Sequence, residues 1–190
     1  MLKDVIRSNR SYRRFHEDVS ISIDTLKELV DLARLSATGG NKQPLKFYLS
    51  CDPDRNNKIF PLLTWAGAIP EWPGPGEGER PSAYILILGD NEISQSYFGV
   101  DHGIAAQSIL LGAIEMGLGG CMLSSIKKEE AHKLLNIPSR FEILLTIALG
   151  KPKEKVVIDT LKPGEDTKYW RESDGTHHVP KRRLEDIIIY

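Results

Sequence analysis

Cysteine is scarce in this sequence, long apolar runs are missing, and neither sign of charge dominates. The only cysteines are Cys51 and Cys121, with no Cys-x-x-Cys pair and no Cys/His spacing suited to zinc. This composition argues against a disulfide framework and against a structural metal, and it favours a reducing cytoplasm. The formal net charge of −1 gives no general attraction to nucleic acid or to a membrane surface. No apolar run approaches the roughly 20 residues that a membrane helix needs, and the first residues do not resemble a secretion signal. We therefore expect a soluble, cytoplasmic protein.

The length of 190 residues fits a single domain spanning residues 1–190. Helical spacing of apolar residues, with Ser22 as a helix N-cap, and short apolar runs of strand length define the expected elements. The run AYILIL should lie inside a sheet, and the helix beginning at Asp101 is apolar on nearly every face, as suits a subunit interface. We predict helices over residues 2–9, 23–36, 55–65, 101–116 and 127–135, and strands over residues 46–51, 83–88, 121–123 and 142–149.

Two segments show little of this helical or strand spacing. Residues 67–81 contain too much proline and glycine for a regular element, and we expect a long loop, which is either a functional cover or disordered. Because Trp65 and Trp72 supply aromatic surface that a solvated linker would not need, we favour a substrate-side lid. Residues 151–190 are predicted to form an extended tail with little to bury, ending in a strand at Ile187, Ile188 and Ile189. An exposed strand of this kind would aggregate, so it should pair with a sheet edge of its own chain or of a partner. We expect His177 and His178 to face water.

Four short segments carry residues suited to binding. Arg10, Ser11 and Arg13 offer guanidinium forks and a hydroxyl, which match a phosphate, although so short a charge run is also typical of a solvated surface. Residues 37–44 (ATGGNKQP) allow close backbone approach to a flat ligand, or they form a helix cap and turn. Residues 117–125 (GLGGCMLSS) suit either a ligand-facing turn or tight packing of a helix on a strand. Residues 181–183 (KRR) either complete an anion site or solvate the tail.

Taken in this order, the four segments resemble the nitroreductase family of flavoenzymes, from about residue 5 to the C-terminus. The matching motifs are R-S-x-R followed by Phe15, then G-G-N-K-Q-P, the helix G-I-A-A-Q-S-I-L-L, the turn G-L-G-G-C and the late K-x-R. The resemblance implies an α+β fold with a mixed sheet flanked by helices. It also implies an intertwined homodimer in which a long central helix packs against its mate and the C-terminal tail docks on the partner.

The resemblance further implies FMN as the cofactor and NADH or NADPH as a transient electron donor. By position, Arg10, Ser11 and Arg13 would hold the FMN phosphate and ribityl end together with Lys181 and Arg183. The other subunit would line the flavin with Thr38, Gly39 and Asn41, and the turn at Leu123, Ser124 and Ser125 would lie against the isoalloxazine. Arg13 and Lys181 or Arg183 are candidates for a cation that stabilises the reduced flavin. Several relatives carry a glutamate at or beside Ser124, which this chain lacks.

The implied reaction passes a hydride from NAD(P)H through flavin N5 to a small acceptor, such as a nitroaromatic or a quinone, by a ping-pong mechanism with no side-chain general acid. No G-x-G-x-x-G motif follows a strand, so a separate dinucleotide domain is not expected. A second hypothesis is a flavin-binding or flavin-consuming protein without an external acceptor. A third treats the basic segments as a nucleic-acid arm, against which the near-neutral charge argues.

Overall fold

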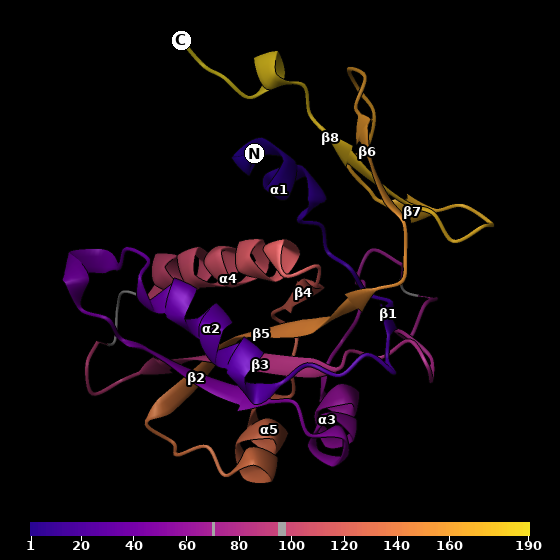
Figure 1. The fold of residues 1–190 in the computed structure, drawn as a ribbon. Helices are drawn as coiled ribbons and strands as arrows, with labels where there is room; N and C mark the ends of the chain where they lie inside the picture. Colours follow the sequence, from indigo (N-terminus) through magenta and orange to yellow (C-terminus); the bar gives the residue numbers. More distant parts are fainter. Residues whose placement is uncertain (70, 95–97) are drawn as a thin grey trace.

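An antiparallel sheet forms the centre of the molecule (Figure 1). The computed structural model describes residues 1–69, 71–94 and 98–190. Four strands follow the order β1-β5-β3-β2, and a fifth strand, β4, also pairs with β5. Their bounds are Phe15–His16 for β1, Leu45–Ser50 for β2, Ala83–Asp90 for β3, Gly119–Leu123 for β4 and Phe141–Pro152 for β5. Every pairing between these named strands is antiparallel, so the expectation of a mixed central sheet is wrong for this chain alone.

Helices cover both faces of this sheet, as the sequence predicted. Helices α2 (Ile23–Arg34) and α4 (Phe98–Glu115) lie on one face, and α3 (Pro53–Ile59) and α5 (Lys128–Leu135) lie on the other (Figure 1). Strand β3 is buried along its whole length because its side chains alternate between the two cores. Ile85 and Ile87 join the core under α2 and α4, whereas Leu86 and Leu88 join the core that α3 and α5 cover.

The helix starts follow local capping chemistry. Ser22 caps α2 by accepting a hydrogen bond from the Thr25 amide, which confirms the predicted start of that helix. Asp52 caps α3 in the same way, with Pro53 in the first turn. Helix α3 therefore begins before residue 55 and ends before residue 65, the bounds predicted for it, and a 3-10 turn follows it at Phe60–Leu62. The first helix, α1 (Leu2–Ser8), also forms where it was predicted.

The C-terminal segment corrects the prediction of an extended tail. Strands β6 (Val156–Thr160), β7 (Trp170–Arg171) and β8 (His177–Lys181) form a second, three-stranded sheet, in which β6 and β8 run parallel. In Figure 1 this sheet and α1 extend from the α4 side of the molecule. A 3-10 turn follows at Leu184–Asp186, and residues 187–190 form no strand. The expected pairing of residues 187–189 with an edge of the same chain is thus wrong, whereas pairing with a partner stays a prediction.

No helix in the described ranges has the length and apolar character needed to cross a bilayer. Both cysteines are free thiols, and Cys121 is buried in β4. Residues 67–81 form no helix or strand where they are described, which leaves out Pro70, and the prediction of a long irregular loop is confirmed for the remainder.

Candidate functional site

The basic segment at Arg10–Arg14 lies directly on strand β4. The Tyr12 amide donates a hydrogen bond of 3.0 Å to the Gly120 carbonyl, and Ser11 forms a bridge with the same glycine. A Cβ on Gly119 would lie 2.6 Å from the Tyr12 ring, and one on Gly120 would lie 2.6 Å from the Ala148 carbonyl oxygen. Gly119 therefore allows the close approach of the basic segment to the sheet, and Gly120 allows the close approach of strand β5.

A cavity of about 270 Å³ opens between this segment, helix α4 and strand β8. Strand β8 contributes every second residue, because side chains at that spacing share a face. Three cations line the cavity, and no carboxylate does. Its lining residues are Asn9, Arg10, Ser11, Arg13, Gln107, Leu110, Met122, Tyr169, His177, Val179 and Lys181. Of the predicted phosphate contacts, the fold therefore brings together Arg10, Ser11, Arg13 and Lys181 in one chain.

Burial leaves Arg10 with unused hydrogen-bonding capacity. One guanidinium nitrogen donates to the Ile6 carbonyl at 2.9 Å, and the buried Nε has no partner among the described residues. Burial also lowers the pKa of Arg10, because the charged form loses solvent. An anion in the cavity would relieve this deficit.

Arg13 lies deeper, with 9% of its surface exposed. Its guanidinium lies 5.0 Å from the centroid of the Tyr169 ring, and Nη1 lies 3.3 Å from the Ser11 carbonyl oxygen and 3.4 Å from Nε2 of His177. All three contacts are with neutral groups. The nearby carboxylate of Glu154 accepts the backbone N–H of Arg13 rather than its side chain.

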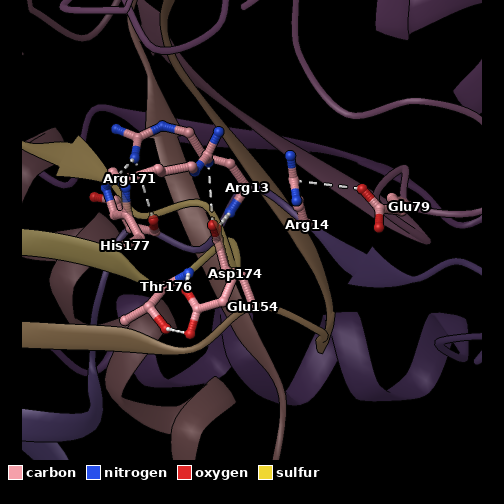
Figure 2. A network of polar contacts seen from close by, with 9 residues as sticks. Arg13, Arg14, Glu79, Glu154, Arg171, Asp174, Thr176 and His177 are labelled. Carbon is pink, nitrogen blue, oxygen red and sulfur yellow. Dashed lines mark hydrogen bonds and ion pairs between the residues drawn. The ribbon is translucent and has the colours of Figure 1, made fainter.

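Glu154 connects this group to the next arginine. Its carboxylate is 1% exposed and lies 3.1 Å from the Arg171 guanidinium, so Arg13, Glu154, Arg171 and His177 form one connected group of polar contacts (Figure 2). A buried carboxylate is stable only where donors surround it, and here a backbone amide and a guanidinium do so.

His177 is buried, with 1% of its surface exposed, which contradicts the expectation that it faces water. Burial, with further contributions from Arg171, Arg13 and His178, lowers the pKa of His177 to about 4. His178 points to the opposite side of β8, where its ring stacks on Trp170 and its nitrogens lie 2.8 Å from Asp159 and 3.2 Å from Glu172. Neither histidine is a solvated tail residue.

Arg183 does not join the cavity within one chain. Its guanidinium pairs with Asp186 at 2.9 Å and with Glu185 at 3.3 Å, in the turn that follows β8. Two carboxylates therefore occupy the guanidinium that the sequence assigned to the phosphate, and they also weaken the case for a basic nucleic-acid arm at residues 181–183.

Thr38, Gly39 and Asn41 lie at the other end of α4. The Gly39 amide donates to the buried Asp101 carboxylate at 2.9 Å, in the first turn of that helix. The cavity residues of α4 follow six and nine positions later, roughly 9 to 14 Å along the axis. Gly40, Asn41 and Gln43 all adopt positive φ angles, of 56°, 53° and 51°. Positive φ angles at non-glycine residues such as Asn41 and Gln43 are typical of functional sites, although this loop is not among the residues that line the cavity.

The turn after β4, at Leu123, Ser124 and Ser125, does not line this cavity. Leu123 is buried in the core beneath α3 and α5, so its side chain is not available to a ligand. Ser124 and Ser125 are exposed, and the Ser125 carbonyl accepts a hydrogen bond from the Thr64 amide. Met122 is the residue of this strand that lines the cavity.

The Gly- and Pro-rich loop packs on the C-terminal sheet. The ring of Trp72 lies 4.0 Å from the Arg171 guanidinium, and the Ala68 amide donates to the Tyr169 hydroxyl at 3.3 Å. Trp65 is a core residue rather than the exposed aromatic surface that we expected. The loop therefore contacts the residues that support Arg13, and its role as a lid stays a prediction.

Fold and cavity together define a two-core α+β protein with a cation-lined pocket that suits a phosphate-bearing ligand. The model of the nitroreductase family matches residues 6–151. The chain belongs to the nitroreductase family and is, by family, an oxidoreductase.

Relatives and solved structures agree with this assignment. A candidate NADH dehydrogenase/NAD(P)H nitroreductase from Archaeoglobus fulgidus is 27% identical over 158 residues, which cover 80% of this chain and 85% of that protein. The crystal structure of a nitroreductase family protein from Streptococcus pneumoniae covers 100% of both chains with a TM-score of 0.73 and 16% identity. An FMN-dependent nitroreductase from Clostridium difficile aligns over 98% of this chain and 96% of its own, with a TM-score of 0.68 and 19% identity. These structures show that the fold is shared.

Proposed function

We propose that this protein is an FMN-dependent oxidoreductase that passes a hydride from NADH or NADPH to a small organic acceptor, such as a nitroaromatic or a quinone, by a ping-pong mechanism. The family supports two-electron chemistry, and the names of two similar proteins include NAD(P)H and FMN. The observation that carries the proposal is the cavity lined by Arg10, Arg13 and Lys181 without a carboxylate.

The residues present fit the phosphate end of FMN. The guanidinium of Arg10, the hydroxyl of Ser11 and the ammonium of Lys181 are donor groups of residues that line one cavity. A phosphate dianion would meet these donors in charge-assisted hydrogen bonds, each contributing about 1.5–3 kcal/mol. Arg13 would add its charge from the deeper side. Arg183 would join only if its carboxylate pairs opened.

FMN, when bound, supplies the hydride chemistry at flavin N5. The chain's own residues bind, orient and tune that group. Arg13 and Lys181 would place positive charge near it and so favour an anionic reduced state. Backbone amides of residues 123–125 would lie against the ring. Thr38, Gly39 and Asn41 would line it from a second copy of the chain, because about one half of α4 separates them from the cavity of their own chain. This proposal therefore includes a homodimer.

Flavin titration tests the proposal directly. The purified protein is expected to be yellow or to take up FMN, and Arg10→Ala should weaken FMN binding about 10- to 150-fold, the equivalent of about 1.5–3 kcal/mol. Riboflavin, which lacks the phosphate, should lose little affinity. Arg7→Ala is the matched control, since Arg7 is an exposed arginine outside the cavity. A colourless protein that does not bind added FMN, or an Arg10→Ala protein that binds FMN normally, contradicts the proposal.

The reaction is tested separately. Oxidation of NADH and of NADPH should be followed with a panel of quinones and nitroaromatics, each acceptor at several fixed donor concentrations. Parallel double-reciprocal lines are expected of a ping-pong cycle. Intersecting lines would reject the proposed order, whereas flavin binding without turnover of any acceptor would favour a flavin-binding protein that has no external acceptor.

A further inference from the structure

The guanidinium of Arg13 keeps its charge unneutralised although it is nearly buried. Among the described residues, no carboxylate forms an ion pair with it, and its contacts include an aromatic ring, a carbonyl oxygen and an imidazole nitrogen. Neighbouring arginines differ in this respect. Arg171 has Glu154 at 3.1 Å, and Arg14 has Glu79 at 3.4 Å. The fold therefore pairs these two arginines with carboxylates and leaves Arg13, at the cavity wall, without one among the described residues.

The contact with His177 favours one tautomer of the imidazole. A guanidinium can only donate, so Nε2 of His177, 3.4 Å from Nη1 of Arg13, must accept. The proton of the neutral ring then resides on Nδ1, which is buried and has no partner in the described part of the chain. An imidazolium would place a second cationic donor against Arg13. The low pKa of His177 agrees with a ring that stays neutral.

Tyr169 completes the support. Its ring packs on that of His177 with centroids 5.1 Å apart, and it presents its face to the guanidinium. Its hydroxyl accepts a hydrogen bond from Ala68 of the loop. The imidazole and the phenol ring thus hold Arg13 from the side of the C-terminal segment.

We propose that His177 is a positioning residue, which holds the Arg13 guanidinium at the cavity wall through a neutral Nε2 acceptor and so keeps the charge of Arg13 available to an anionic group. A carboxylate at this position would hold the guanidinium equally well but would neutralise its charge. A neutral acceptor holds the guanidinium in place without neutralising its charge. This inference rests on the proposed function in so far as the anionic group is the FMN phosphate.

Substitutions at His177 that differ only in charge test the proposal. His177→Gln places an amide oxygen near the position of Nε2, and His177→Glu places a carboxylate of the same shape there. The measured quantity is the ratio of riboflavin Kd to FMN Kd, which isolates the contribution of the phosphate. We expect the Gln variant to keep this ratio within about threefold of wild type, and the Glu variant to lower it by about tenfold or more, which corresponds to about 1.4 kcal/mol. His177→Asn, which is too short to reach Arg13, should also lower it.

Several outcomes overturn the proposal. If the Glu variant prefers FMN as strongly as the Gln variant does, the unneutralised charge of Arg13 plays no part. If Gln and Asn lower the ratio equally, the imidazole does not act through its Nε2 acceptor. A wild-type protein that binds riboflavin as tightly as FMN, or neither flavin, rejects the phosphate site and with it this inference. An FMN-selective wild type with equal Glu and Gln variants rejects the inference alone.

Nitrogen-15 NMR of the wild-type imidazole gives a readout that does not depend on the folding of any variant. We expect His177 to show the tautomer with a protonated Nδ1 and an unprotonated Nε2 at neutral pH, with the signal assigned by its loss in His177→Gln. Because the two tautomers have distinct nitrogen shifts and couplings, the opposite tautomer or a charged ring would refute the proposed geometry.

Discussion

Acidification should destabilise the folded protein through His177. The imidazole is buried against Arg13 and Arg171, and His178 follows it in the same strand, so each neighbouring charge opposes protonation. In the unfolded chain the same ring takes up a proton near its ordinary pKa of 6.5. The unfolded state therefore binds more protons than the folded state between pH 6.5 and about 4, and stability must fall as the pH is lowered through that range.

The size of the effect follows from the two pKa values. A shift from 6.5 to about 4 corresponds to about 3.4 kcal/mol at about 1.36 kcal/mol per pKa unit. We expect about half of it, about 1.7 kcal/mol, because the ring lies at the wall of a cavity from which solvent screens the charge. The contribution is fully present above pH 6.5 and is lost progressively toward pH 4.

Urea unfolding of wild type and His177→Gln, compared at about pH 7.5 and about pH 4.5, measures this contribution. Other carboxylates and histidines titrate in both proteins, so the difference between the two free energies of unfolding isolates residue 177. We expect wild type to lose about 1 to 1.5 kcal/mol more than the variant on acidification. An equal loss in both proteins would show that His177 titrates alike in the folded and unfolded states, and the interpretation of its burial would then be wrong.

Three further predictions concern the supports of the site. Gly120→Ala should destabilise the fold by about 1–3 kcal/mol in urea unfolding, because the new Cβ would lie 2.6 Å from a backbone oxygen of the neighbouring strand. Gly76→Ala is the control, since its new Cβ would meet nothing within 4 Å, and equal effects of the two substitutions would refute the close-approach argument. Trp72→Ala should lower the free energy of unfolding by about 1 kcal/mol through loss of the stacking on Arg171, which an unchanged urea midpoint would disprove. Deleting residues 184–190 should weaken the proposed homodimer in sedimentation equilibrium, and an unaltered dimer would reject docking of the tail on a partner.

Local signals were sufficient for the main body of the fold. Ser22 begins α2 because its hydroxyl caps the first turn. The residues of the AYILIL run in β3 are apolar on both faces of the strand, so they can all be buried only inside a sheet that helices cover on both sides. The same kind of signal failed for the C-terminal segment. Strand β8 contains Pro180 and two histidines, and it forms by parallel pairing with β6, about 20 residues earlier, which no local pattern encodes. Ile187 to Ile189 have strand propensity but pair with no strand in the described part of the chain.

Local signals also predicted part of the site. Arg10, Ser11, Arg13 and Lys181 carry obvious phosphate chemistry, and the fold brings them together. His177 was missed because it was assigned to a solvated tail. The spacing between His177 and Lys181 did indicate that the two residues lie together, since residues four apart share a face in a strand. That inference requires knowing that the segment is a strand. The carboxylates that pair with Arg183 follow it by two and three residues, so sequence alone could have weakened that assignment.

The arrangement at Arg13 illustrates how binding and stability compete in one pocket. A carboxylate in place of His177 would satisfy a buried guanidinium that now meets only neutral acceptors, and a buried charge without a counterion is unfavourable. This chain does bury a carboxylate close by, because Glu154 lies 3.1 Å from Arg171 and contacts the backbone of Arg13. From Arg13, Glu154 accepts only the backbone amide. The charge of the Arg13 guanidinium is therefore left for an anion bound in the cavity. An anion that binds there should therefore stabilise the fold as well as fill the site, since a ligand that binds only the native state raises its stability by mass action.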